Sequence, residues 1–437
     1  MKKIILGIIF LFIATVLVTP FFVGIAAEKT INKQIDKMAQ TANISISNVY
    51  KRNWFSSHAN TIFNLSQLLP SLGLTQLDSI SGLTNISVKI RSEIIHGPFT
   101  MKRFYSKQPL SMPVLGVIKS HITILFPPDI LNFAPAITAY TSIFPNGSAS
   151  GVFSIPGINY TDNITDQSLI SGNISGETGL AKKGTILYLN FHTPKILLEN
   201  HKNSAEIKGL NCSWHNSKGA KGISAISFGL RINSLTTGKT KIDKIFFSST
   251  KKEKSGNLFF NAKLSIMAIK DENTNFGPVK IGLNCKNIKK DVYLQLLSLA
   301  NDAKKEPENQ FARVLLMAQI MGLLPELLAE SPEINLEEFK IGTPTGNILI
   351  NANIKAGNSK IVNPNNLKKI IKSINANFTM TIPDSIAEKY IFSNDNPRSV
   401  MLQKMMIRNN NNYTLNLKYI NSLFFVNGKP FSADDRN

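Results

Sequence analysis

The stretches NISISNVY (residues 43–50) and NISVKIR (residues 85–91) both alternate polar and apolar side chains. Successive side chains of a β-strand point to opposite faces, so this pattern predicts strands with one wet face and one apolar face. Such strands are typical of antiparallel sheets, in which one face packs and the other meets water. We therefore expect the chain to build an antiparallel sheet.

The same alternation recurs along most of the chain, and clusters of Gly, Asn, Pro and Ser separate the alternating segments as turns. The fold class predicted is α+β and β-dominated, a large, mostly antiparallel curved sheet with a few packed helices in the C-terminal half. The further strands are expected at 114–125, 147–155, 184–191, 205–214, 224–232, 241–248, 258–267, 333–341, 347–354, 377–382, 413–419 and 423–426.

Helical periodicity replaces alternation at 291–303 and 308–330, and shorter helical or irregular segments are expected at 367–374, 387–392 and 401–407. The segment 308–330 is apolar on more than one side, which requires burial on more than one side. Two interpretations stay open: a core helix laid across the sheet, or a Met- and Leu-rich wall of a lipid-sized pocket. The side chains that would line this pocket are Phe311, Leu315, Met317, Met321 and Leu324.

The chain begins with a long uncharged segment, from Ile4 to Ala27. As a helix it would span roughly 35 Å, slightly more than the roughly 30 Å of bilayer hydrocarbon. We expect residues 1–27 to form an uncleaved transmembrane signal anchor and residues 28–42 a helical stalk. A cleaved signal peptide with its site near Ala26 is the main alternative, although its apolar core would be unusually long. Lys2 and Lys3 favour a cytoplasmic N-terminus, whereas the lysines after residue 28 weaken that signal.

The rest of the chain divides by pattern into a β-rich part (residues 43–288) and a helix-plus-strand part (residues 289–437). With 43% apolar residues and 26 Phe there is enough apolar material for a large core. No second uncharged apolar run approaches the length of a membrane span, so we expect a single-pass protein.

The formal net charge of +21 calls for an explanation. Lys and Arg are scattered as singles and pairs, without a basic run or a basic helix interleaved with aromatic residues, so nucleic acid is not an expected partner. A solvated basic surface without a specific partner and weak attraction to anionic lipid or glycolipid both remain open.

The two cysteines, Cys212 and Cys285, lie about 70 residues apart. In an oxidising compartment they could pair, and closing that loop would contribute on the order of 4 kcal/mol in the chain-entropy model. Two buried free thiols on separate strands are the equal alternative.

No motif in the sequence predicts catalysis. The six histidines form no H-x-x-H pair. Cys212 and His215 have the spacing of two metal ligands, but the second pair of ligands that a zinc site needs is absent. The TGKT stretch at 237–240 lacks the first glycine of a phosphate loop, and GSASG at 147–151 places Ala149 at the nucleophile position. We expect neither enzymatic activity nor a cofactor, a metal site or catalytic residues.

Several short motifs, in the same order from end to end, resemble the YdgA-like family of bacterial proteins, a domain of unknown function. They are YKRNWFSS (50–57), IHGPF (95–99), LLPELL (323–328) with SPEI (331–334), and VNGKP (426–430). The resemblance implies an inner-membrane anchor and a periplasmic ectodomain, and it supplies no catalytic residues. The motif residues for which a structural or interaction role is expected are Arg52, Trp54, Phe55, His96, Gly97, Pro98, Pro325, Ser331, Pro332, Asn427 and Gly428.

The function predicted from these features is a single-pass inner-membrane protein whose periplasmic ectodomain binds a lipid, a glycolipid or another amphiphilic envelope component. The alternative is a scaffolding protein that self-associates or docks another envelope protein through exposed sheet edges and binds no small ligand. An envelope hydrolase is the least favoured class because no motif supports it.

Overall fold

The structure is a computed structural model, and it describes residues 20–33, 35–36, 39–40, 44–64, 87–96, 114–125, 136–162, 167–182, 185–200, 204–218, 224–272, 274–305, 310–357, 372–392 and 397–431. The chain divides into two compact units, Met1–Asn203 and Ser204–Asn437. The expected change of character near residue 288 therefore falls inside the second unit. Both units consist mainly of antiparallel β-sheet, which confirms the β-dominated fold class.

Unit 1 is an antiparallel meander in which β1 to β5 each pair with the next strand along the chain, β6 pairs with β9, β7 with β8, and both β8 and β9 with β10. Its strands are β1 (Ile46–Arg52), β2 (Ser56–Asn64), β3 (Ser87–His96), β4 (Gly116–Leu125), β5 (Ala136–Ile143), β6 (Ala149–Ile155), β7 (Asn159–Asp162), β8 (Gln167–Ser171), β9 (Ile174–Leu180) and β10 (Ile186–Glu199).

Two of the unit 1 strands are interrupted. β8 and β9 pair with the same edge of β10 and keep one register, with Ser171 opposite Ile196 and Ser175 opposite His192. β6 and β7 pair with β9 and β8 in the same way. Pro156 and Gly157 separate β6 from β7, as expected because proline cannot donate to the ladder and glycine weakens a strand interior.

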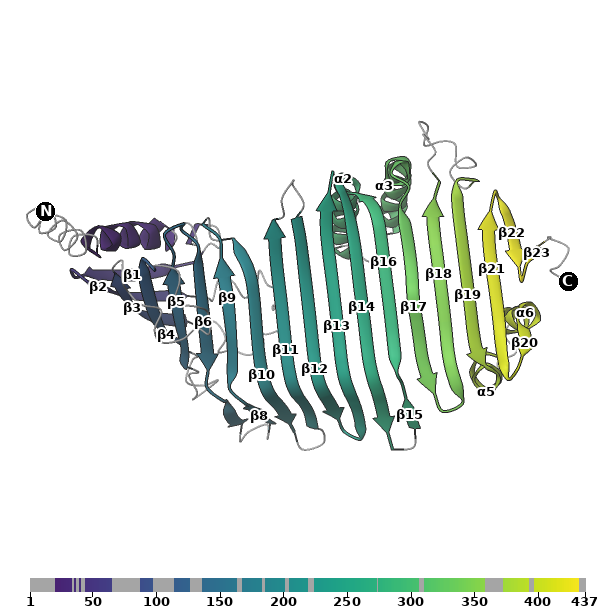
Figure 1. The fold of residues 1–437 in the computed structure, drawn as a ribbon, viewed down its shortest axis with the longest axis horizontal. Coiled ribbons are helices and arrows are strands. Elements are labelled where there is room, and N and C mark those ends of the chain that lie inside the picture. The colour runs from purple at the N-terminus through teal and green to yellow at the C-terminus, as the bar shows by residue number, and fades with distance from the viewer. Residues whose placement is uncertain are drawn as a thin grey trace, which may run out of the picture. The chain divides into compact units, whose positions relative to one another are not determined.

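Unit 2 is a second antiparallel meander with longer strands (Figure 1). They are β11 (Ser204–Lys218), β12 (Ser224–Thr237), β13 (Thr240–Lys254), β14 (Asn257–Asp271), β15 (Thr274–Phe276), β16 (Val279–Lys289), β17 (Glu333–Thr343), β18 (Gly346–Ala356), β19 (Ile374–Pro383), β20 (Ile407–Asn409), β21 (Asn412–Ile420), β22 (Leu423–Val426) and β23 (Lys429–Pro430).

Two helical insertions interrupt this meander. α2 (Lys290–Lys305) and α3 (Gln310–Ala329) lie between β16 and β17, which nevertheless pair with each other. α5 (Asp384–Ile386), the π-helix η5 (Ala387–Ile391) and α6 (Pro397–Met405) lie between β19 and β20. Figure 1 shows α2 and α3 at one end of β16 and β17, and α5 and α6 at the other end of the neighbouring strands.

In unit 1, residues 20–33 form a helix, drawn in purple in Figure 1. Within the described residues, which begin at position 20, no helix is both long and apolar enough to cross a membrane. Residues 1–19 of the expected anchor lie outside the described part of the chain. Its last third and the first residues of the expected stalk form one continuous helix.

The expected strands and the two long helices are all present, with bounds that differ by a few residues. The parts of the sheet that were not predicted are β2, β5, the β7–β8 hairpin with β9, β16, and the short strands β15, β20 and β23. Of the helix expected at 367–374, residues 367–371 lie outside the described residues, and β19 already begins at Ile374. The segment 401–407 is the end of α6 followed by the start of β20.

Candidate functional site

One face of the unit 2 sheet is apolar across its whole width. The register places nine side chains directly opposite one another on nine neighbouring strands, and because side chains alternate along each strand, all nine point to the same face. This set, the apolar row, consists of Cys212, Leu230, Phe247, Leu264, Ile281, Phe339, Ile350, Met380 and Leu415. With strands about 4.8 Å apart, the row spans roughly 38 Å across the sheet.

The row is flanked by further apolar side chains on the same face. On one side, Ile232, Ile245, Ile266, Val279 and Ile341 are paired in sequence across β12 to β17. Together with the apolar row, these residues make up the apolar face of unit 2.

The helical insertion after β19 covers one end of the apolar face. Ile382, Ala387, Met406 and Leu415 form a buried cluster, against which Phe378, Met380 and Leu417 from the sheet and Phe392 and Leu402 from the helices also pack. We call this cluster and its helices the C-terminal cap. Leu415, the last member of the apolar row, is only 2% exposed.

The helix pair α2–α3 covers a second, smaller part of the apolar face. Leu258 on β14 and Val292 on α2 are fully buried, and the rings of Phe260 and Tyr293 lie 5.1 Å apart. Away from these contacts the apolar face is more exposed to solvent. Leu283 and Ile354, which also belong to this face, are 40% and 47% exposed.

The middle of the apolar face is only partly covered. Phe247, Leu264, Ile281 and Phe339 are all half-buried. Among the described residues of β11 to β18, the buried hydrophobic side chains are Leu258, Val279 and Ala356, at the ends of their strands. A sheet that leaves apolar side chains uncovered is expected to bind something apolar, since monomeric soluble proteins rarely expose large contiguous apolar patches.

The opposite face of the same strands is polar. Asn261, Asn284, Asn335, Asn353 and Asn377 are paired in sequence from β14 to β19. Asn353 Nδ2 donates to Asn335 Oδ1 at 2.6 Å, and both Asn335 and Asn353 donate to the Glu333 carboxylate, at 3.1 and 3.3 Å. This asparagine row satisfies its polar groups within the sheet and in water, so the unit presents one wet face and one apolar face.

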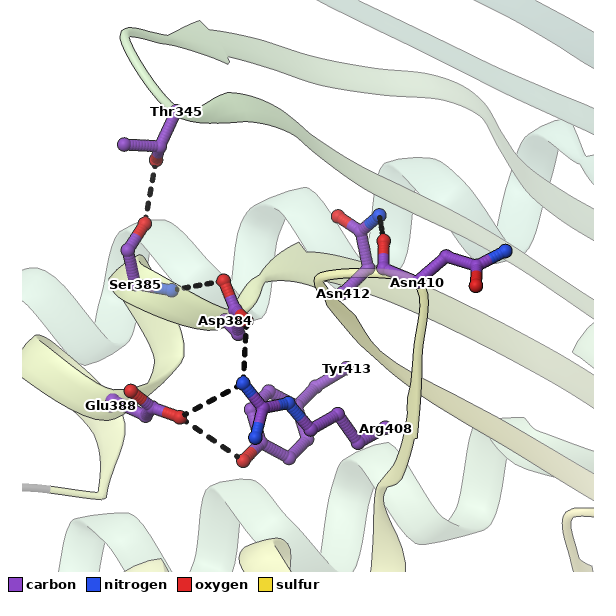
Figure 2. Close-up of polar contacts among 8 residues, drawn as sticks. All are labelled: Thr345, Asp384, Ser385, Glu388, Arg408, Asn410, Asn412 and Tyr413. Carbon is purple, nitrogen blue, oxygen red and sulfur yellow. Dashed lines mark hydrogen bonds and ion pairs between the residues drawn. The ribbon is translucent and has the colours of Figure 1, made fainter.

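A network of polar side chains surrounds the start of the C-terminal cap (Figure 2). Arg408 donates to the Asp384 carboxylate at 2.8 Å and lies 3.9 Å from that of Glu388, to which the Tyr413 hydroxyl also donates at 3.4 Å. Ser385 donates its hydroxyl to that of Thr345 at 2.8 Å. The hydrogen bond from Arg408 holds the pKa of Asp384 below its usual value. The network ties α5 and η5 to the strands that they cover.

The helix pair differs from the expectation of burial on more than one side. Met317 and Met321 are 64% and 41% exposed, so they face solvent and do not line an enclosed pocket, while Leu324 is half-buried and Pro325 is buried. The side chains of Phe311 and Leu315 lie outside the described residues.

The two cysteines are free. Cys212 on β11 and Cys285 on β16 lie on the same face, but β12, β13 and β14 run between them, a separation of roughly 19 Å. A disulfide requires Cα atoms within about 7 Å, so the pairing considered from the sequence is wrong for this fold. Burial raises the pKa of both thiols.

The motif residues of unit 1, far apart in sequence, meet around the N-terminal helix. His96 is buried and its Nδ1 lies 3.2 Å from the carbonyl oxygen of Pro20, while Arg52 pairs with Glu28 at 3.0 Å. The rings of Trp54 and Phe21 lie 5.0 Å apart. We call these contacts the N-terminal cap.

Two other motif residues of unit 1 have weaker or undescribed roles. Phe55 is half exposed, and its carbonyl oxygen accepts the backbone N–H of His96 at 2.8 Å. Gly97 and Pro98 lie outside the described residues.

The motif residues of unit 2 shape corners. Ser331 and Pro332 connect α3 to β17, and the Pro332 carbonyl oxygen accepts the N–H of Ala356 at 3.0 Å. Asn427 and Gly428 both have positive φ and form the turn after β22. The Asn427 amide also donates to the carbonyl oxygen of Met405 at 2.6 Å, which joins this turn to the C-terminal cap.

The described residues contain no group of three His, Cys, Asp or Glu side chains that could hold a metal ion. The site that sequence reasoning missed is the apolar row itself. The strand that carries its member Ile281 could have been predicted, because VKIGLNC (279–285) alternates as clearly as the segments that were predicted.

The comparison with protein families assigns the chain almost from end to end. No curated protein and no solved structure matches it. Residues 1–434 match the model of DUF945, described as a bacterial protein of unknown function, and the chain therefore belongs to this family of bacterial proteins.

Proposed function

We propose that this protein is a YdgA-like member of its family, anchored in the bacterial inner membrane as a single-pass protein, whose periplasmic part binds a lipid or another amphiphile along the apolar face of unit 2. The observation that carries the proposal is the apolar row, which crosses nine strands and is covered mainly at its C-terminal end. The function is one of binding and not of catalysis.

The chemistry of the face favours long apolar chains. Its half-buried middle consists of branched aliphatic and aromatic side chains, which gain about 25 cal/mol for each Å² of apolar surface removed from water. The asparagine row points to the opposite face, and charged side chains of β13 such as Lys251 and Asp243 reach the apolar face only near the strand ends. An acyl chain laid across the strands would therefore meet apolar side chains along its length and leave a charged headgroup at the margin, in water.

Photo-cross-linking can test this proposal with two neighbouring positions. Phe339 and Lys340 are adjacent on β17 and point to opposite faces of the sheet. A benzoylphenylalanine at position 339 of the full-length protein, irradiated in membranes, is expected to give lipid adducts by mass spectrometry. The same residue at position 340 serves as the control. Equal adducts at both positions, or none at position 339, would contradict the proposal.

The alternative of a scaffolding or self-associating protein has one observation in its favour. Leu294, Leu297 and Met317 on α2 and α3 are 48%, 42% and 64% exposed, which leaves apolar side chains available for another protein. Benzoylphenylalanine at position 317 distinguishes the two functions. A reproducible protein partner or homodimer from position 317, without lipid at position 339, would favour the scaffold.

A further inference from the structure

A pocket of about 470 Å³ opens on the face of the unit 1 sheet that the N-terminal helix does not cover. Six charged or ionisable side chains line it: Lys51, His58, Arg91, Glu93, Lys119 and His121. They come from four neighbouring strands, β1 to β4. We call it the cationic pocket.

The register of the strands brings these side chains together in two rows. Lys51, His58, Glu93 and Lys119 are paired in sequence across β1 to β4. Two residues further along the same strands, Arg91 on β3 lies directly opposite His121 on β4. Opposed side chains in antiparallel sheets have Cβ atoms about 5 Å apart, so the ends of side chains on neighbouring strands can approach a common ligand above the sheet.

The charges of the pocket do not balance. Three permanent cations face one carboxylate, which leaves two positive charges even with both histidines neutral. Among the described residues, no ion pair engages Lys51, Arg91 or Lys119. Lys119 lies opposite Glu93, and its Nζ is 6.0 Å from the centre of the Tyr140 ring, whereas Lys51 and Arg91 lie opposite the histidines. The surplus of positive charge makes the pocket attractive to an anion.

We propose that the cationic pocket binds a phosphate group. The arginine offers the planar fork that matches phosphate oxygens, the two lysines add point charges, and the two histidines add N–H donors. The pocket is large enough for a phosphate with attached groups, but four short strands do not offer the extended basic surface that nucleic acid needs.

The phosphate could belong to a phospholipid headgroup or to a soluble anion. The headgroup is favoured by position, because β1 begins shortly after the helix that continues the proposed anchor. That choice of source rests on the proposed membrane location, whereas the phosphate site does not.

Calorimetry on the full-length protein in uncharged detergent, with inorganic phosphate as the probe, tests the site. We expect saturable binding that chloride at equal ionic strength does not reproduce. Arg91→Gln should weaken binding about tenfold, because it removes a charge-assisted pair of hydrogen bonds. Glu93→Gln should tighten binding about threefold, because it removes the only carboxylate of the pocket.

Lys263→Gln is the matched control, since Lys263 is an exposed lysine on the polar face of unit 2. It should leave phosphate binding unchanged. Absence of saturable binding, or an equal loss from Arg91→Gln and Lys263→Gln, would overturn the proposal. The opposite effects expected for Arg91→Gln and Glu93→Gln cannot both arise from a folding defect.

A second measurement identifies the source. The protein is reconstituted in nanodiscs of phosphatidylcholine, with or without phosphatidylglycerol, and hydrogen exchange of β1 to β4 is followed. Protection that requires phosphatidylglycerol and is lost in Arg91→Gln supports a lipid headgroup. Protection by added inorganic phosphate alone supports a soluble ligand at the same site.

Discussion

The two helical caps of this protein are held to their sheets by different means. In the N-terminal cap, the contacts of the helix with the sheet include an ion pair, a hydrogen bond from a buried histidine and a tilted aromatic pair. In the C-terminal cap, a cluster of fully buried hydrophobic side chains fills the space between helices and strands. Both caps use residues of the family motifs.

The difference indicates which cap can open. A buried apolar cluster is lost only with the fold, since its stability comes from burial and packing. A cap that depends on a buried histidine and a partly exposed ion pair responds to pH and salt. We therefore infer that the C-terminal cap stays in place as long as unit 2 is folded, whereas a change of pH or salt can weaken the N-terminal cap.

The largest expected effect compares the covered and open ends of the apolar row. Leu415→Ala removes a buried side chain from the C-terminal cap and should lower the free energy of unfolding by about 3 kcal/mol. Leu264→Ala removes the same atoms from the half-buried middle of the row and should cost only about 1 kcal/mol. Urea unfolding of both variants checks this, and equal costs would show that the middle is as covered as the end.

A smaller effect is expected at the N-terminal cap from Gly24→Ala. A Cβ at position 24 would lie 2.6 Å from the His96 ring, which is buried and cannot move away. Overpacking of this kind typically costs 1–3 kcal/mol, although alanine itself favours helix. Faster hydrogen exchange in residues 20–33 would report the loss of docking.

The control for this substitution is the double variant Gly24→Ala with His96→Ala. Removing the ring makes space for the new methyl group, so the exchange rates of the double variant should not exceed those of His96→Ala alone. If the effects of the two substitutions on exchange simply add, a clash between position 24 and the His96 ring is not the cause of the faster exchange.

A pH effect of smaller size is expected at the same cap. Burial lowers the pKa of His96, and among the described residues its Nε2 has no hydrogen-bond partner. The unfolded chain then binds a proton more readily than the folded one, so stability is full above about pH 6.5 and falls as the pH drops from there to the folded pKa. The protection of residues 20–33 against hydrogen exchange, relative to the intrinsic rate at each pH, should fall as the pH is lowered from about 7.5 to about 5.5.

The matching variant is His96→Gln, which keeps a polar side chain but does not titrate. Its exchange in residues 20–33, corrected for the intrinsic dependence on pH, should stay level across this range. A pH response as large as that of the unchanged protein would assign the effect to another group.

Alternation predicted most of the sheet, because long strands with one apolar face leave a clear pattern in the sequence. It missed β2 (SSHANTIFN), whose buried positions include Ser57 and Thr61, so that the inner face reads as polar. It missed β9 (ISGETGL) because Gly176 and Gly179 interrupt the pattern, although they make room for Phe153 and Tyr188 on neighbouring strands.

The apolar row could not be read from any one segment. Its existence depends on the register, which aligns Leu264 with Ile281 and Ile281 with Phe339 although β17 begins more than forty residues after β16 ends. The cationic pocket has the same origin. Lys51, Arg91 and Lys119 lie far apart in the sequence, and the pairing of β1 to β4 gathers them.

The smallest expected effect concerns the polar network of the C-terminal cap. Arg408 lowers the pKa of Asp384, so the ionised carboxylate is favoured in the folded state. This contribution is present above the unfolded pKa, near pH 4, and is lost as the pH falls through the folded value. Because both side chains are partly exposed, removing Arg408 should change stability little at pH 7.

Arg408→Gln should therefore change mainly how the stability of the protein falls at acidic pH. Urea midpoints measured from pH 6 to pH 3 should fall less steeply in this variant than in the unchanged protein, because one carboxylate no longer titrates below its unfolded pKa. Lys404→Gln makes the same change of charge on α6, where no contact with Asp384 exists among the described residues, and should keep the original slope. If both variants flatten the curve equally, net charge and not the pair explains the acid response, and the C-terminal cap is held by its apolar cluster alone.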